Sequence, residues 1–172
     1  MRGRLSVTII ARDSARHIEA CLASVSWADE IVVSDSGSRD GTLEICRAHG
    51  ARVFSDDWLG FGPQKNRCVG RAVGPWVLSL DSDERVTPAL RVEIEKLLTD
   101  GTDRDAFEVP RRNYFLGRWV RHGGWYPDYC PRLFRKERAQ FSDRLVHEVL
   151  EVPSGRIGRL DGELEHFTYS SL

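Results

Sequence analysis

The chain has 172 residues, of which 41% are hydrophobic and 30% charged, a composition typical of a soluble globular protein of about one domain. No apolar run approaches the roughly 20 residues needed to cross a bilayer, which excludes a helical membrane span in these residues. The start of the chain also lacks the apolar core and cleavage site of a secretory signal. We therefore expect a cytoplasmic protein.

Strand-like and helix-like patterns alternate through the first 100 residues. Strands are expected at residues 5–11, 30–35, 51–54 and 76–80, and helices after Ser14, from Thr42 to His49, around residues 64–72 and after Thr87. Ser14 and Thr87 are expected to cap their helices. Strands that alternate with helices about every 20 to 25 residues predict a parallel, doubly wound sheet with right-handed crossovers. The expected fold class is therefore α/β.

The second half of the chain has a different pattern. Residues 99–105 are polar and rich in turn formers, so we divide the chain there into 1–100 and 101–172. Short β-like runs follow at 106–110, 119–121, 132–135, 146–152 and 163–169. These runs predict a smaller, mixed or antiparallel extension that covers the ligand edge of the sheet.

Acidic side chains follow two of the predicted strands. Asp35 ends the second strand and Asp81-Ser82-Asp83 follows the fourth, each after an apolar run. In α/β proteins ligands bind at the carboxyl ends of the strands. If the two strands are neighbours, Asp35 lies near Asp81, where it could accept a hydrogen bond from uracil or a ribose hydroxyl. The alternative is that Asp35 only caps the turn that follows it.

The two acids of Asp81-Ser82-Asp83 are spaced to share one divalent cation. Hard ions such as Mg²⁺ and Mn²⁺ prefer oxygen ligands and commonly bridge the phosphates of a nucleotide. Residues 62–67 add an anion site, because the free N–H groups of a helix start favour negative charge and Lys65 and Arg67 supply positive charge. An ordinary basic first turn is the alternative. Together these stretches predict a site for a metal-bound nucleotide.

Positive charge is concentrated in residues 111–144, which carry 9 basic and 3 acidic side chains interleaved with aromatic residues. Such a surface suits an anionic membrane, a phosphorylated glycan or nucleic acid. The alternative is a β-rich region with solvated arginines and aromatic side chains in its core. Trp125 and Tyr126 could likewise either stack on the face of a sugar or fill that core.

Several motifs in combination resemble the family 2 inverting glycosyltransferases of GT-A fold. They are the first strand, the DSGSRDGT element at 35–42, the PQKNR helix start at 63–67, LSLDSDE at 78–84, and the stretches 111–119 and 122–128. The resemblance covers essentially the whole chain and is strongest to bacterial lipopolysaccharide core β-1,4-glucosyltransferase-like proteins. It implies a GT-A fold, which is a mostly parallel, Rossmann-like sheet flanked by helices.

The resemblance also implies roles for individual residues. Asp35 would contact uracil or ribose, Asp81 the ribose side, Lys65 the nucleotide, and Asp83 a metal ion, Mg²⁺ or Mn²⁺, that holds the diphosphate. The full set of implied nucleotide-sugar contacts is Asp13, Asp35, Lys65, Arg67, Asp81 and Ser82. In two respects the chain departs from the pattern. Residues 11–14 lack the Glu that many relatives carry after the first strand, and many relatives continue with a helical, membrane-associated tail, so we expect a truncated protein.

Inversion by direct displacement requires a base that removes a proton from the acceptor hydroxyl as it attacks. Asp128 is the first choice, because many members of the family place their base just before an Arg-Leu pair such as Arg132-Leu133. Glu148 is the rival, and a surface salt bridge between Asp128 and Arg132 is the structural alternative. The resemblance thus implies a UDP-sugar or similar donor and a glycan or lipid-linked acceptor in lipopolysaccharide or envelope polysaccharide synthesis. Peripheral contact with the inner membrane follows from such an acceptor.

Three other interpretations are kept. The chain could be a catalytically inactive sugar-nucleotide-binding or scaffold module, as the missing Glu allows. It could be a nucleotidyltransferase, although no glycine-rich, Arg-containing phosphate loop follows the first strand. A metal site made of His122, His147, His166 and Asp128 lacks the helical HxxxH spacing that would support it. We expect no nucleic-acid partner, because the basic block forms no recognisable nucleic-acid-binding motif.

Overall fold

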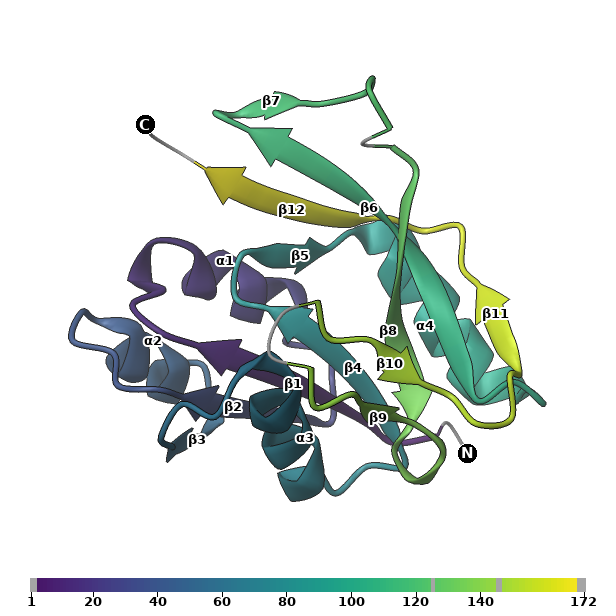
Figure 1. The fold of residues 1–172 in the computed structure, drawn as a ribbon, viewed down its shortest axis with the longest axis horizontal. Helices are drawn as coiled ribbons and strands as arrows, with labels where there is room; N and C mark the ends of the chain where they lie inside the picture. The colour runs from purple at the N-terminus through teal and green to yellow at the C-terminus, as the bar shows by residue number, and fades with distance from the viewer. Residues whose placement is uncertain (1–2, 125, 145–146, 170–172) are drawn as a thin grey trace.

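The computed structural model describes residues 3–124, 126–144 and 147–169. Through residue 100 the expected alternation of strands and helices is present (Figure 1). The elements are β1 (Leu5–Ala11), α1 (Ala15–Ser24), β2 (Glu30–Asp35), α2 (Thr42–Ala48), β3 (Arg52–Ser55), α3 (Phe61–Arg71), β4 (Trp76–Asp81), β5 (Glu84–Val86) and α4 (Pro88–Asp100). The predicted α/β fold class is confirmed.

The regular elements described in the second half of the chain are short and long strands and one 3₁₀ turn. Its elements are β6 (Ala106–Phe115), β7 (Arg118–Trp119), β8 (Asp128–Arg135), the 3₁₀ turn η1 (Lys136–Arg138), β9 (Gln140–Phe141), β10 (Leu150–Glu151), β11 (Ile157–Arg159) and β12 (Leu164–Tyr169). Of the predicted run at 146–152 only β10 is a strand, and residues 145 and 146 lie outside the described residues. The short strands β5, β9 and β11 were not predicted.

The strand order places a ligand site at one point of the sheet. The main path of the sheet is β3-β2-β1-β4-β8-β6-β12-β5, with β7 and β11 pairing to β6. The first four of these strands are parallel, and β1 has β2 on one side and β4 on the other. The chain therefore adds β2 and β3 on one side of β1 and then β4 on the other side, so the order of strands in the sheet reverses at the boundary of β1 and β4. At such a switch point the connections leave a crevice outside the carboxyl ends of the strands.

The sheet runs through both parts of the chain without a break. Strand β8 pairs antiparallel with β4, and β6 pairs antiparallel with β8, so the second half extends the same sheet. The main hydrophobic core likewise joins residues such as Leu5 and Leu78 to Phe107, Leu133 and Leu164. Residues 99–105 are thus the end of α4 and a turn into the next strand of that sheet. Among the described residues no helix is long and apolar enough to cross a membrane.

One predicted helix start is confirmed, and two others differ from expectation. Thr87 caps α4 as predicted, by accepting a hydrogen bond from the Leu90 N–H at 3.3 Å. Ser14 stands at the N-cap position of α1 but makes no capping bond; its hydroxyl instead contacts the Ser82 hydroxyl at 2.9 Å. Helix α3 begins at Phe61, earlier than predicted, because Pro63 is tolerated in a first turn and Gly60 adopts φ 99° just before it.

Candidate active site

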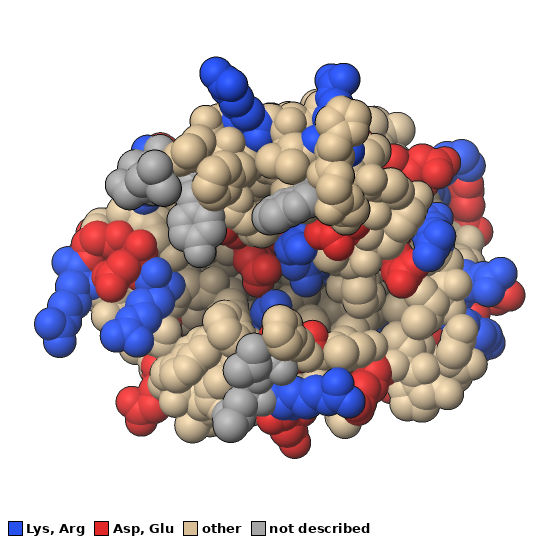
Figure 2. All heavy atoms as spheres, turned by 45° about the horizontal axis from the view of Figure 1, so that its top comes forward, with Lys and Arg blue, Asp and Glu red and all other residues tan. Residues whose placement is uncertain are grey.

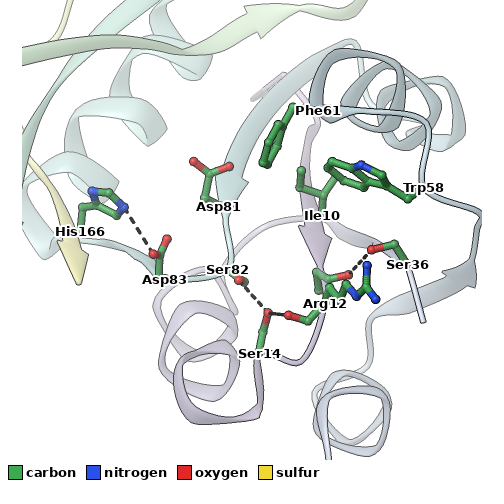
Figure 3. Close-up of a pocket in the computed structure, with 11 residues that line it drawn as sticks. Ile10, Arg12, Ser14, Ser36, Trp58, Phe61, Asp81, Ser82, Asp83 and His166 are labelled. Carbon is green, nitrogen blue, oxygen red and sulfur yellow. Dashed lines mark hydrogen bonds and ion pairs between the residues drawn. The ribbon is translucent and has the colours of Figure 1, made fainter. Parts of the chain in front are cut away.

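A pocket of about 450 Å³ lies at the switch point of the sheet (Figure 3). Its walls come from the ends of β1 and β4, the segments after β1 and β2, the start of α3, and β12. The lining residues are Ile10, Ala11, Arg12, Ser14, Ser36, Trp58, Phe61, Asp81, Ser82, Asp83 and His166. A cavity therefore lies at the predicted edge of the sheet, and the Asp-Ser-Asp stretch is part of its lining.

Asp35 and Asp81 lie at the same edge of the sheet but on strands that are not neighbours. In the strand register Ala11 pairs with Asp35 and Ile10 pairs with Asp81, so β1 separates the two acids. Two strand spacings correspond to roughly 10 Å between the backbones. The two carboxylates therefore do not form one cluster.

The carboxylate of Asp35 is buried and bonded within its own turn. It accepts hydrogen bonds from the Gly37 N–H at 3.0 Å, from the Ser38 N–H at 2.9 Å and from the Ser38 hydroxyl. Asp35 is absent from the residues that line the pocket. Asp13 behaves similarly, since its carboxylate accepts the Arg39 N–H at 2.7 Å. This geometry agrees with the turn-capping alternative for Asp35, and nucleotide contacts by either acid stay predictions.

Asp81 is held between two cations. One carboxylate oxygen lies 3.1 Å from the Lys65 ammonium, and the other lies 3.1 Å from the Arg132 guanidinium. Desolvation raises the pKa of the Asp81 carboxyl, but the charges of Arg132 and Lys65 outweigh it and hold that pKa well below its usual range. Asp81 is therefore ionised and rigidly oriented at neutral pH.

The ion pairs continue from Asp81 to Asp128. Arg132 also contacts the fully buried Glu84 at 2.8 Å, and Glu84 lies 3.4 Å from Arg111. Arg111 then donates two hydrogen bonds to one oxygen of Asp128, at 2.9 and 2.7 Å. Figure 2 shows a hollow in the surface where acidic and basic side chains lie together. The structural alternative of a salt bridge between Asp128 and Arg132 is wrong in its partner: Arg111 contacts Asp128, because the two residues are paired directly across β6 and β8.

The two basic side chains near the start of α3, Lys65 and Arg67, point to different parts of the molecule. Lys65 is 3% exposed and, besides Asp81, contacts the carboxylate of Glu148 at 2.6 Å. Arg67 turns the other way, toward Asp56 at 3.5 Å, and lines a separate cavity beside Ser36 and Trp58. Lys65 thus reaches the Asp81 side of the site, whereas Arg67 does not line the main pocket. Its predicted nucleotide contact remains a prediction.

Asp83 faces His166 across the pocket wall. The nearest atoms are Asp83 Oδ2 and His166 Nε2, 3.4 Å apart (Figure 3). The other ring nitrogen, Nδ1, lies 2.7 Å from Asn113 Oδ1, and Asn113 donates through Nδ2 to Asp128 at 3.3 Å. A carboxylate oxygen and an imidazole nitrogen are both ligands that a divalent ion accepts. In the described part of the chain no group of three or more His, Cys, Asp or Glu side chains could hold a metal, so the alternative site of three histidines does not form.

A second cavity adjoins the first on the side of Asp128. It has a volume of about 320 Å³ and is lined by Arg111, Asn113, Gly123, Gly124, Asp128, His166 and Thr168. His166 lines both cavities. Tyr126 is half-buried, packs edge-on against Trp119 and donates to Glu163 at 2.5 Å, so its ring and hydroxyl are both engaged within the β-rich part. Trp125 lies outside the described residues.

The sequence interpretation missed three residues of this site. Glu84 directly follows the acidic motif, and its complete burial was not foreseeable from that position. Asn113 carries no sequence signal of its own. His166 was considered only within the three-histidine cluster, and the residue pattern Leu-Glu-His-Phe-Thr-Tyr of β12 does not distinguish it from a surface position.

The fold and the site define a GT-A-like α/β protein with an acidic pocket at its switch point. The chain belongs to glycosyl transferase family 2, whose model matches residues 6–153. It is 30% identical over 95% of its length to the lipopolysaccharide core biosynthesis glycosyltransferase LpsC of Rhizobium meliloti, and 28% identical over 98% to an uncharacterized glycosyltransferase of Rickettsia prowazekii. The chain covers 63% and 62% of these relatives, about three fifths of their length.

Solved structures agree with this fold. The crystal structure of Staphylococcus aureus TarS 1-349 in complex with UDP-GlcNAc superposes with a TM-score of 0.70, at 17% identity, over 98% of this chain and 60% of that one. Glucosyl-3-phosphoglycerate synthase from Mycobacterium tuberculosis, crystallised with Mn²⁺, UDP-glucose and phosphoglyceric acid, superposes with a TM-score of 0.55 at 27% identity, over 64% of this chain and 44% of that one. The GT-A fold expected from the sequence is confirmed.

Proposed function

We propose that the chain carries the donor site and the reacting groups of an inverting glycosyltransferase. The enzyme would move a sugar from a nucleotide-diphosphate donor to a hydroxyl of a glycan or lipid-linked acceptor in lipopolysaccharide or envelope polysaccharide synthesis. The observation that carries the proposal is the pocket at the switch point, with Asp81, Asp83 and His166 in its wall. The similarity to LpsC and the UDP-sugar complexes of the neighbours support the substrate class.

The residues of the pocket fit a divalent ion, Mg²⁺ or Mn²⁺. Asp83 Oδ2 and His166 Nε2 would supply two ligands, and phosphate oxygens and water would complete the shell, as is usual for Mg²⁺ at nucleotides. When bound, the ion would neutralise charge that develops on the leaving diphosphate. Asp81 is already saturated by Lys65 and Arg132, so we assign it to orienting the nucleoside side of the donor.

The acceptor side of the proposed reaction is the second cavity. Asp128 lies there, fixed by Arg111 and Asn113. Partial burial raises the pKa of the Asp128 carboxyl. The hydrogen bonds from Arg111 and Asn113 and the charge of Arg111 lower this pKa by more than burial raises it, so it lies below its usual value. The carboxylate is ionised at neutral pH and can accept the proton of a hydroxyl group that approaches through this cavity.

The decisive experiment is a screen of nucleotide sugars with Mn²⁺, read as release of nucleoside diphosphate. The proposal expects turnover of at least one UDP-sugar that stops when EDTA is added. Binding of UDP-sugars without any turnover would instead favour the inactive binding module. Release of pyrophosphate from a nucleoside triphosphate and a sugar phosphate would identify a nucleotidyltransferase.

Asp128 and Glu148 can be distinguished as bases by isosteric changes. Asp128→Asn is expected to reduce kcat by about 100-fold or more while the KM for the donor changes little, because only proton removal is lost. Glu148→Gln is expected mainly to raise the KM for the donor, because it releases Lys65 from an ion pair at 2.6 Å. The reverse pattern in steady-state kinetics would transfer the role of base to Glu148.

Peripheral membrane contact is part of the same proposal. The end of β6 and the turn that follows it expose Phe115 (39%) and Leu116 (41%), and Arg118 at the start of β7 is also exposed. Apolar side chains next to arginines favour an anionic bilayer surface. We expect the protein to sediment with vesicles that contain anionic phospholipid and Leu116→Glu to weaken this at least about threefold. Equal sedimentation with neutral vesicles would contradict the role of charge.

A further inference from the structure

We infer that Asn113 is a positioning residue that ties the two sides of the site together, by orienting Asp128 with one end of its amide and His166 with the other. The inference rests on the proposed roles of those two residues. Asn113 is 4% exposed and sits in β6, where it pairs with His166 of β12 in the parallel register. Directly paired residues in neighbouring strands point to the same face of a sheet.

The neighbours of Asn113 fix the orientation of its amide. An ionised carboxylate only accepts hydrogen bonds, so the group that faces Asp128 Oδ2 at 3.3 Å must be the NH₂ of Asn113. The amide oxygen then faces His166 Nδ1 at 2.7 Å, and that ring nitrogen must carry a proton. A single amide can satisfy both partners only in this arrangement.

The orientation of Asn113 determines what His166 offers to the donor pocket. With its proton on Nδ1, a neutral imidazole would present the lone pair of Nε2 toward Asp83 Oδ2, 3.4 Å away. Two acceptors facing each other leave a place for a cation between them. A ligating histidine usually donates its other N–H to an oxygen that fixes its tautomer, and Asn113 supplies that oxygen here.

The same amide also acts on the acceptor side. Arg111 occupies Asp128 Oδ2 with two short bonds, and Asn113 adds a third donor to this oxygen. Three donors on one oxygen hold the carboxylate plane and leave the other oxygen, Oδ1, for an incoming hydroxyl; its neighbour is the weakly donating thiol of Cys130 at 3.7 Å. Asn113 thus couples the geometry of the proposed base to that of the proposed metal ligand.

The test uses two substitutions that separate the two ends of the amide. Asn113→Ala removes both, and Asn113→Asp keeps an oxygen for His166 but loses the donor to Asp128. We expect Asn113→Ala to mix the two tautomers of His166, to weaken Mn²⁺ binding in the presence of UDP by about 10-fold and to lower kcat. Asn113→Asp should keep the Nδ1–H tautomer and Mn²⁺ affinity within about threefold, and lose kcat alone.

Three readouts are needed. The tautomer is read by ¹⁵N NMR of the imidazole ring, assigned with His166→Gln; Mn²⁺ affinity is read by electron paramagnetic resonance of the protein with UDP; kcat is read as UDP release. Tyr114→Phe is the matched control, because it removes a 3.4 Å contact to Glu165 between the same two strands and preserves the ring stacked on Phe167. It should leave all three readouts unchanged.

The outcomes distinguish this inference from the proposed function. An unchanged His166 tautomer in Asn113→Ala would overturn the inference whether or not the protein turns over a UDP-sugar. Equal losses of Mn²⁺ affinity in Asn113→Ala and Tyr114→Phe would overturn it as well, because the effect would then be general loosening of the strands. Absence of UDP release in the wild-type protein would count against the proposed function, and the tautomer and Mn²⁺ readouts would still decide the role of Asn113.

Discussion

Asp83→Ala is expected to abolish metal-dependent turnover, with kcat for UDP release at least about 100-fold lower at any Mn²⁺ concentration. The side chain of Asp83 is one of two groups that face each other at 3.4 Å in the pocket wall, and the other, His166, offers a single ring nitrogen. The backbone oxygen of Asp83 keeps its bond from the Phe167 N–H at 3.1 Å whatever the side chain. The loss of kcat should therefore come from the missing metal ligand and not from unfolding, so the melting temperature should change little.

The control is Asp103→Ala, at a carboxylate whose side chain is 84% exposed in the turn after α4. This variant should turn over the donor at the wild-type rate and show the same loss on addition of EDTA. Activity of Asp83→Ala above about a tenth of the wild-type value would rule out the metal-holding role. So would wild-type turnover that persists after exhaustive chelation.

Arg132→Met is expected to have the largest effect on stability. Burial lowers the pKa of the Arg132 guanidinium, but the carboxylates of Glu84 and Asp81 raise it more, to above its usual value. Removing the guanidinium leaves the fully buried Glu84 carboxylate with one nearby cation, Arg111 at 3.4 Å, and a hydrogen bond from the Asp81 N–H at 3.0 Å. It also deprives Asp81 of one of its two cations. Breaking a buried pair of this kind costs about 3 to 5 kcal/mol, a large part of the roughly 5 to 15 kcal/mol that stabilises a typical domain.

Urea unfolding monitored by circular dichroism measures this cost. Arg135→Met is the matched control, because Arg135 lies on the same strand, is 36% exposed, and contacts Asp105 at 3.6 Å. It should cost less than about 1 kcal/mol, since Asp105 keeps its bonds to Arg156 and Ser154. Combining Arg132→Met with Glu84→Gln should recover part of the loss, because the unpaired charge is then removed. Similar costs for Arg132→Met and Arg135→Met would show that the ion-pair chain is not structural.

The α/β half was predictable because its signals are local. The apolar runs that form β1, β2 and β4 and the Thr87 cap of α4 are properties of short segments, and they are where they were expected. The lengths of the later strands were not. Strand β6 continues through Pro110 to Phe115, since the polar residues in it pair with neighbours on β8 and β12 that no local window contains.

The sequence pointed to this edge of the sheet but not to the side-chain contacts there, and the roles of the site residues stay predictions. The Asp-Ser-Asp stretch lines the pocket as expected, whereas Asp35 is separated from it by β1 and bonded within its own turn. Spacing along the chain suggested Arg132 as the partner of Asp128. The antiparallel register of β6 and β8 instead places Arg111 opposite Asp128 and turns Arg132 toward Asp81 and Glu84.

By itself, the sequence determined the alternation of strands and helices, the strand ends that carry acids, and the family. These follow from the periodicity of burial and from motifs that lie within a few residues of one another. Only the tertiary structure decided which charges meet. The chain Lys65-Asp81-Arg132-Glu84-Arg111-Asp128 draws on α3, β4, β5, β6 and β8, and the amide of Asn113 joins Asp128 to His166 across β6 and β12. Such contacts depend on the strand order and register of the sheet, which are set by packing between segments far apart in the chain.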